Sequence, residues 1–104
     1  MTVKSQLHAC CDSLMAGVRA AERAAERTDD TDPRVLRTLR ACQDVVERLE
    51  RSSADVTEMQ VEIALGVVKQ AVVDLTAGSA ANAVLGAVRN AVDRLQRLRD
   101  ELKA

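Results

Sequence analysis

The sequence predicts an all-α fold, a single antiparallel four-helix bundle with up-down-up-down topology, and three observations support it. Four stretches of the 104-residue chain carry aliphatic residues at alternating spacings of three and four, the period at which one face of a helix is buried. Short segments separate these stretches, so consecutive helices are expected to be antiparallel neighbours. The chain contains no Phe, Trp or Tyr, so its core must be built from aliphatic side chains, Met and Cys.

The first helix is predicted over residues 3–27 and is followed by a polar turn at residues 28–31. The second helix is predicted over residues 33–52. Asp32 is a suitable N-cap for it, and Pro33 suits the first helical position because its missing N–H costs nothing there. The two apolar seams contain Val3, Leu7, Cys10, Leu14, Gly17, Ala21 and Ala24, and then Val35, Leu39, Cys42, Val46 and Leu49.

The third helix is predicted over residues 56–77, with Asp55 and Glu58 as a capping pair at its start. It is the most apolar of the four, because further aliphatic residues widen its main seam beyond one face. This excess predicts either heavy coverage within the monomer or partial burial in an oligomer. The main seam contains Val61, Leu65, Val68, Val72 and Leu75, and the widening residues are Met59, Ile63, Val67, Ala71 and Val73.

The fourth helix is predicted over residues 80–103, after Gly78 as a helix stop and Ser79 as an N-cap. In an alternative arrangement with three helices, the last two would be continuous and would carry Gly78 in their interior. We expect the four-helix arrangement and treat residues 1–104 as one domain, since this length is enough for a core without disulfides or a structural metal. The seam of the fourth helix contains Val84, Val88, Ala91, Leu95, Leu98 and Leu102.

The composition argues against several classes of function. The net charge is −1, from 15 basic and 16 acidic residues, so the surplus of Lys and Arg on which phosphate binding rests is absent and we expect no nucleic-acid partner. No apolar run approaches the length of a membrane span, and residues 1–6 show no apolar signal segment, so we expect no membrane association. Three cysteines, an odd number, are typical of reduced thiols and predict a cytoplasmic protein.

Four sulfur-bearing side chains are candidates for a soft-metal site. Cys10, Cys11 and Met15 lie along the first helix, and Met59 is expected near the same level in the antiparallel layout. Thiolate and thioether ligands favour Cu(I) and then zinc, so copper and zinc are the only cofactors considered. The Cys-bearing first helix and the helix lengths are similar to those of small four-helix copper-storage bundles, a resemblance that implies a core lined by many cysteines. This chain carries Val, Leu or Ala at most such positions, and the competing interpretation is that its cysteines are small buried hydrophobic residues.

No catalytic constellation is visible, and we predict that the protein is not an enzyme. His8 is the only histidine, and no Glu precedes it in the Glu-x-x-His pattern of di-iron bundles. His8 and Cys11 would share one helical turn, but no third group is identifiable that orients the imidazole. The chain also lacks a glycine-rich phosphate loop and zinc-finger spacing.

The strongest functional signal is an association surface on the third and fourth helices. We predict a non-catalytic helical interaction module that self-associates as a homodimer or binds a protein partner through an apolar helical face. Arginines near the start of the second helix are expected to form a charged rim. The predicted contact residues are Val67, Val73, Ala80, Ala83 and Ala87, with Arg34 and Arg37 at the rim. Two alternatives stay open, a soft-metal-binding bundle and a structural scaffold, natural or designed, with no evolved ligand.

Overall fold

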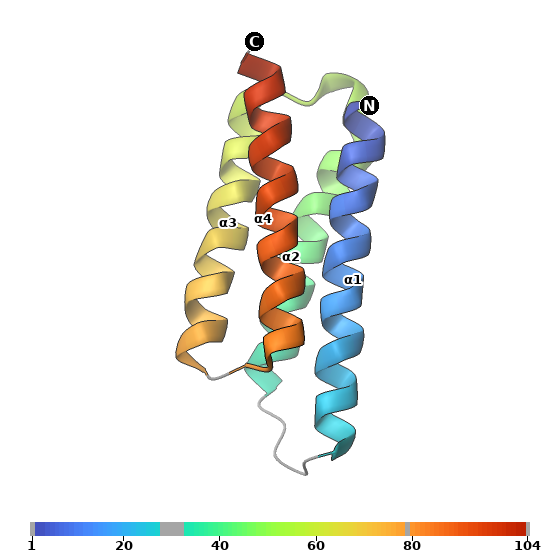
Figure 1. Cartoon of the computed structure of the whole chain (residues 1–104). Helices are drawn as coiled ribbons and strands as arrows, with labels where there is room; N and C mark the ends of the chain where they lie inside the picture. The colour runs from blue at the N-terminus through green and yellow to red at the C-terminus, as the bar shows by residue number, and fades with distance from the viewer. Residues whose placement is uncertain (1, 28–32, 79, 104) are drawn as a thin grey trace.

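Four α-helices make up most of the chain (Figure 1). The computed structural model describes residues 2–27, 33–78 and 80–103. Within these ranges there is no β-strand, and the predicted all-α four-helix bundle is confirmed. None of the helices formed by these residues combines the length and the apolarity that crossing a bilayer requires. The helices are α1 (Val3–Arg27), α2 (Pro33–Arg51), α3 (Glu58–Ala77) and α4 (Asn82–Lys103), with a short 3-10 helix, η1 (Ser53–Asp55), between α2 and α3.

Each helix of the bundle packs against two antiparallel neighbours (Figure 1). α4 lies between α1 and α3 on one side, and α2 lies between them on the other, so α1 and α3 occupy diagonal positions. The chain runs up, down, up and down, which brings the start of α1 and the end of α4 to the same end of the bundle. The short connections leave no room for a crossover, which explains this order.

The junction between α2 and α3 differs from the prediction. The N–H of Asp55 donates to the Ser52 carbonyl at 2.9 Å within the 3-10 turn, so Asp55 does not cap α3. Instead, Thr57 is the N-cap of α3 and forms a capping box with Gln60, a Thr-x-x-Gln pattern of the same kind. The Thr57 hydroxyl accepts from the Gln60 N–H at 3.3 Å, and the Gln60 side chain accepts from the Thr57 N–H at 3.0 Å. α3 therefore begins at Glu58, two residues later than predicted.

Gly78 ends α3, as predicted, with its N–H donating to the Asp74 carbonyl at 2.9 Å. α4 begins at Asn82 and not at residue 80, so the two helices are separate and the alternative of one continuous helix is wrong. The proposed caps Asp32 and Ser79 and the polar turn at residues 28–31 lie outside the described residues.

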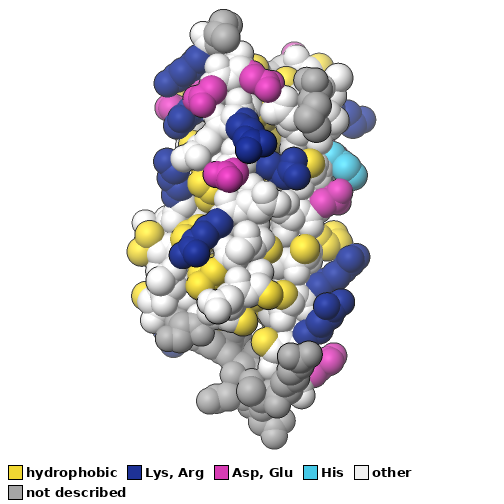
Figure 2. Space-filling model, in the orientation of Figure 1, with side chains coloured by type: hydrophobic (Ala, Val, Ile, Leu, Met, Phe, Trp, Pro, Cys, Tyr) yellow, Lys and Arg dark blue, Asp and Glu magenta, His cyan; other side chains and the backbone are white. Residues whose placement is uncertain are grey.

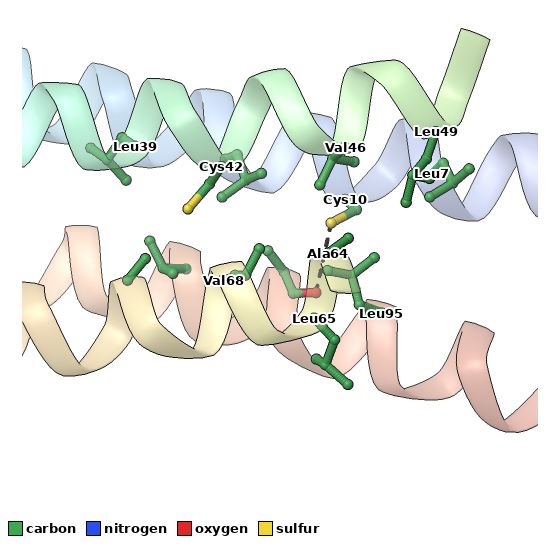
Figure 3. Packing of buried hydrophobic residues seen from close by; sticks show 14 of the residues in the cluster. Leu7, Cys10, Leu39, Cys42, Val46, Leu49, Ala64, Leu65, Val68 and Leu95 are labelled. Carbon is green, nitrogen blue, oxygen red and sulfur yellow. Dashed lines mark hydrogen bonds between the residues drawn. The ribbon is translucent and has the colours of Figure 1, made fainter. Parts of the chain in front are cut away.

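The core is aliphatic along its whole length (Figure 3). Side chains of α1 and α2 face those of α3 and α4 across the bundle axis, and all four predicted seams contribute. Burial of these apolar surfaces is the main force that holds the helices together. The largest fully buried side chains are Leu7, Leu14, Leu39, Leu95, Leu98, Val46, Val61, Val68, Val84, Val88, Cys10 and Cys42.

Gly17 lies where α1 packs tightly against Ala87 of α4. A Cβ atom added at Gly17 would lie 3.2 Å from the Ala87 Cβ and 3.5 Å from the Leu39 Cδ2. The 3.2 Å distance is shorter than most contacts of a Cβ atom, so the small residues at this point serve close packing inside the monomer.

Candidate functional site

An exposed apolar stripe runs along the outer face of α3. Among the described residues, four large hydrophobic side chains are exposed, and three of them belong to this stripe: Met59 is 73%, Ile63 62% and Val73 60% exposed. Gly66 and Gln70 are exposed between them, so the members are spaced by four, three, four and three residues. This is the spacing of a coiled-coil seam, and at 1.5 Å per residue it extends over about 21 Å. We name these five residues the α3 outer stripe.

The α3 outer stripe lies on the side of α3 that faces away from the core. α3 thus carries two apolar seams, one buried against α2 and α4 and one that faces solvent. A Cβ atom added at Gly66 would meet no atom within 4 Å, so the space above the middle of the stripe is open. A groove of about 550 Å³ between α2 and α3 runs beside it, and its lining includes Thr38, Ala41, Ile63, Gly66 and Val67.

The predicted contact residues are divided between different surfaces. Val73 belongs to the α3 outer stripe, and Val67 is half-buried beside it in the α2–α3 groove. Ala87 lies in the contact between α4 and α1, opposite Gly17, and is separated from the stripe. The structure therefore brings only the two valines to one surface.

The other predicted contact residues lie at the end of the bundle where α2 begins and α3 ends. Ala80 is half-buried before the start of α4, and Ala83 is exposed in its first turn. Arg34 and Arg37 are exposed near the start of α2 and, together with Asp74, line a groove of about 550 Å³. The two arginines therefore lie beside the Val73 end of the α3 outer stripe, separated from it by the turn of α3 that carries Asp74.

The three cysteines are free thiols, of which Cys10 and Cys42 are buried and Cys11 is half-buried. Cys10 and Cys42 are fully buried, and the Cys10 thiol donates to the Ala91 carbonyl at 3.6 Å (Figure 3). Burial raises the pKa of Cys10 to about 12, although the nearby Arg94 guanidinium opposes the rise, and raises the pKa of Cys42 to about 11. Both thiols are therefore protonated near neutral pH, whereas nucleophiles and metal ligands need the thiolate.

The predicted soft-metal ligands do not converge. Cys10 points into the core, whereas the Cys11 thiol donates to the Glu50 carboxylate of α2 at 3.4 Å. Met15 is exposed on α1, and Met59 is exposed on α3, the helix diagonal to α1. In residues 2–27, 33–78 and 80–103, no group of three or more His, Cys, Asp and Glu side chains is placed to hold a metal ion.

Glu50, near the end of α2, joins two side chains of α1. Its carboxylate lies 3.0 Å from the His8 Nδ1 and accepts from the Cys11 thiol at 3.4 Å, while the His8 Nε2 lies 3.7 Å from the Asp12 carboxylate. The hydrogen bond to Glu50 and the charge of Asp12 raise the pKa of His8, and the same hydrogen bond lowers the pKa of Glu50. Burial, assisted by the bond to Glu50, raises the pKa of Cys11 to about 12. The cluster holds α1 to α2 and contains a protonated thiol, which is not an activated nucleophile.

The contact between His8 and Glu50 predicts a pH-dependent stability. Because the pKa of His8 in the folded protein is above the unfolded value of about 6.5, the contact stabilises fully below that pH and is lost as the pH rises through the folded-state pKa. Glu50 sets the lower end of the pH range in which the contact stabilises the fold. Because the pKa of Glu50 is lowered in the folded protein, the stabilisation by its carboxylate is lost as the pH falls through the folded-state pKa of Glu50. We expect the melting temperature of the wild type to exceed that of His8→Gln most at about pH 6, and the difference to shrink toward about pH 9.

Circular-dichroism melts of both proteins across this pH range measure the effect. Glu50→Gln should remove the same pH dependence, since it removes the other partner. A difference between wild type and His8→Gln that stays constant with pH would show that His8 contributes only through packing.

Comparisons with known proteins give no match. No family model, curated protein or solved structure is similar to the chain at a significant level. The residues and their geometry therefore carry the functional inference.

Two features of the surface were not predicted from the sequence. The sequence predicts Ile63 and Met59 as residues that widen the apolar seam of the third helix, and Met59 also as a metal ligand. In the structure both belong to the α3 outer stripe. The alternating spacing of four and three residues from Met59 to Val73 is the sequence pattern that indicates this stripe. The same stretch of sequence also carries the more apolar inner seam, which hides the pattern. The second feature is the position of Arg94, whose surroundings come partly from α1 and leave no trace in the local sequence.

Proposed function

We propose that this protein is a non-catalytic helical interaction module that forms a homodimer through the α3 outer stripe. The observation that carries the proposal is the exposure of Met59, Ile63 and Val73 at coiled-coil spacing on one helix face. Exposed apolar side chains that gather on one face mark an interaction site more often than scattered ones do. A second α3 laid along the stripe would bury this surface.

Gly66 supports a close approach from outside the monomer. Glycine in a helix interior costs about 1 kcal/mol relative to alanine, and at Gly66 no atom of the same chain requires the absence of a Cβ. At Gly17, by contrast, the neighbouring helix fills the space. A partner helix that crosses the stripe at Gly66 would fill the space of the missing Cβ, as α4 does at Gly17.

The charges beside the stripe fit a second copy of the chain. Lys69 is the only basic residue of α3 and lies on one border of the stripe, while Asp74 lies on the other. In a parallel pair of helices, residues five apart on opposite borders meet across the seam. Each Lys69 would therefore lie next to the partner copy's Asp74, twice by symmetry.

The test is the oligomeric mass of the purified protein and of Ile63→Glu, measured by sedimentation equilibrium over a range of concentrations. We expect a wild-type dimer and an Ile63→Glu monomer of 11.2 kDa, because two charges buried face to face in the seam have no partner. Val73→Glu should act in the same way. Ile63 is 62% exposed and glutamate is a good helix former, so the monomer should keep its helical circular-dichroism spectrum and melting temperature.

Two further variants separate the stripe from general charge effects. Ala54→Glu adds the same charge at an exposed position of η1 and should leave the dimer intact. Lys69→Glu should weaken the dimer, and adding Asp74→Lys should restore it, since the charge pair is then reversed and not lost. A wild type that stays monomeric at all concentrations contradicts self-association, and the stripe would then have to bind a different protein.

We further propose that the protein acts in the cytoplasm and takes a protein, not a nucleic acid, as its partner. Three free thiols with raised pKa values suit a reducing compartment. A net charge of −1 offers no basic surplus for a phosphate backbone.

A further inference from the structure

One polar side chain, that of Gln70, lies inside the α3 outer stripe. It is exposed, and its neighbours along the stripe are Gly66 and Val73. Hydrophobic side chains reach the edge of the molecule along which α3 runs, at the left of Figure 2. When a second copy covers the stripe, the Gln70 amide leaves water together with its apolar neighbours. A buried amide must then find its hydrogen-bond partners within the interface.

The Gln70 amide is oriented by its own helix. Its Nε2 donates to the carboxylate of Asp74, one helical turn later, at 3.0 Å. An ionised carboxylate only accepts hydrogen bonds, so this contact requires the nitrogen of the amide to face Asp74. A glutamine amide has two N–H donors and one carbonyl oxygen, so one N–H and the oxygen remain after this bond. One donor and one acceptor on the same group are complementary to a second group of the same kind.

The charges beside the stripe do not by themselves fix the direction of the second helix. In a parallel pair, Lys69 meets the partner copy's Asp74. In an antiparallel pair, Lys69 would meet the partner copy's Glu62, because Glu62 lies on the same border of the stripe as Lys69. Glu62 already lies 3.8 Å from the Arg99 guanidinium of α4, yet both pairings join opposite charges. The choice of direction therefore depends on another residue.

The direction of the second helix decides what Gln70 faces. In a parallel pair in register, the two Gln70 side chains lie opposite each other, and the remaining N–H of each reaches the carbonyl oxygen of the other. In an antiparallel pair, the first half of the stripe of one copy lies opposite the second half of the other. Gln70 would then face the partner copy's Met59, Ile63 or Gly66, none of which has a side-chain N–H or oxygen. An amide buried without partners is costly, so the antiparallel pair is disfavoured.

We propose that Gln70 selects a second copy of this chain in parallel orientation and in register, through a reciprocal pair of amide hydrogen bonds in the seam. The inference rests on the proposed homodimer and adds its geometry. A single polar residue in the seam of a coiled coil specifies register in this way, at a cost in stability. The Asp74 carboxylate has enough lone pairs to accept from Gln70 and from the partner copy's Lys69 together. The amide pair and the charge pair therefore favour the same register.

Disulfide cross-linking at the two ends of the stripe tests the orientation. Met59→Cys and Val73→Cys are separate variants, each oxidised briefly at a concentration at which sedimentation shows a dimer. A disulfide needs Cα atoms within about 7 Å, and in a parallel pair in register each introduced thiol lies opposite its equivalent in the partner. In an antiparallel pair centred on Gly66, the two copies of either residue are about 21 Å apart along the helices. We therefore expect both variants to cross-link.

The wild type is the control for the native thiols and should give no cross-linked dimer. Cys10 and Cys42 are buried, and Cys11 is half-buried on α1, the helix diagonal to α3.

Gln70→Leu, added to each cysteine variant, tests the role of the amide. The dimer should be at least as tight as before, because leucine suits an apolar seam. The share of the dimer that cross-links should fall at least about twofold, since parallel and antiparallel pairs become comparable. Gln43→Leu is the matched control and should leave cross-linking unchanged. Gln43 lies on α2 two helical turns before Glu50, on the side that faces α1.

The outcomes separate this inference from the homodimer itself. A Gln70→Leu dimer that cross-links as fully as before overturns the role of Gln70. If either cysteine variant sediments as a dimer and does not cross-link, the parallel register is wrong and the homodimer stands. A wild type that sediments as a monomer at all concentrations removes the homodimer and this inference together.

Discussion

Replacing Leu95 with alanine is expected to lower the free energy of unfolding by about 3 kcal/mol, within the range of other fully buried leucines. The Leu95 side chain is completely buried on α4 and points into the middle of the bundle (Figure 3). The loss has two parts, the transfer energy of the removed methyl groups and the cavity that remains, because neighbouring helices relax only in part. Urea unfolding followed by circular dichroism measures it.

The experiment needs a background in which dimer formation does not contribute, since association stabilises the folded state by mass action. Leu95→Ala should therefore be compared with Leu95 in proteins that both carry Ile63→Glu. Leu85→Ala is the matched control, because Leu85 is half-buried on the same helix and should cost about 1 kcal/mol in proportion to the smaller apolar area removed from water. Equal losses for the two variants would contradict the central position of Leu95.

The second large effect is expected at Gly17, where Gly17→Leu should destabilise the fold by about 2 kcal/mol. A Cβ at this position would already lie 3.2 Å from the Ala87 Cβ and 3.5 Å from the Leu39 Cδ2. The rest of a leucine side chain has no space between α1 and α4, so the helices must move apart and lose contacts along their length. Thermal and urea unfolding of the variant measure the loss.

Gly86→Leu is the same substitution at another helical glycine, and we expect it to raise the stability of the protein and not to lower it. A Cβ at Gly86 of α4 would meet no atom within 4 Å, so the substitution should stabilise the protein by about 0.8 kcal/mol through helix propensity alone. The sequence places Gly17 in the apolar seam of its helix, whereas Gly86 lies outside the seam of the fourth helix. If both variants destabilise equally, the close approach at Gly17 is not what limits the packing of α1 and α4.

The inner and outer faces of α3 follow the same physical rule. Each face carries residues at alternating spacings of three and four, and only the inner one is covered by other helices of the chain. The proposed homodimer would cover the outer one. The proposed homodimer does not need a reactive cysteine, which agrees with thiols whose pKa values burial raises to about 11 or 12.

The helices themselves were predictable from the chain, because each signal for them is local. α1 has the predicted bounds, and α2 ends one residue before its predicted end. Gly78 ends α3 as expected. The predicted start of α3 was wrong because two overlapping capping patterns, one from Asp55 and one from Thr57, occur in the same turn. Asp55 belongs to the 3-10 helix, so Thr57 is the residue that caps α3.

The sequence by itself determined an all-α chain of four helices with aliphatic seams and an antiparallel order, since periodicity and short connections are properties of neighbours along the chain. Only the tertiary structure decided which apolar residues of α3 are buried. Ala71 faces inward while Ile63 and Val73 face solvent, because a helix that is apolar on more than one face turns according to the surfaces of α2 and α4 packed against it. The same holds for the contact of Glu50 with His8 and for the unpartnered Nε of Arg94. These depend on residues from different helices, whose distances no single segment of sequence encodes.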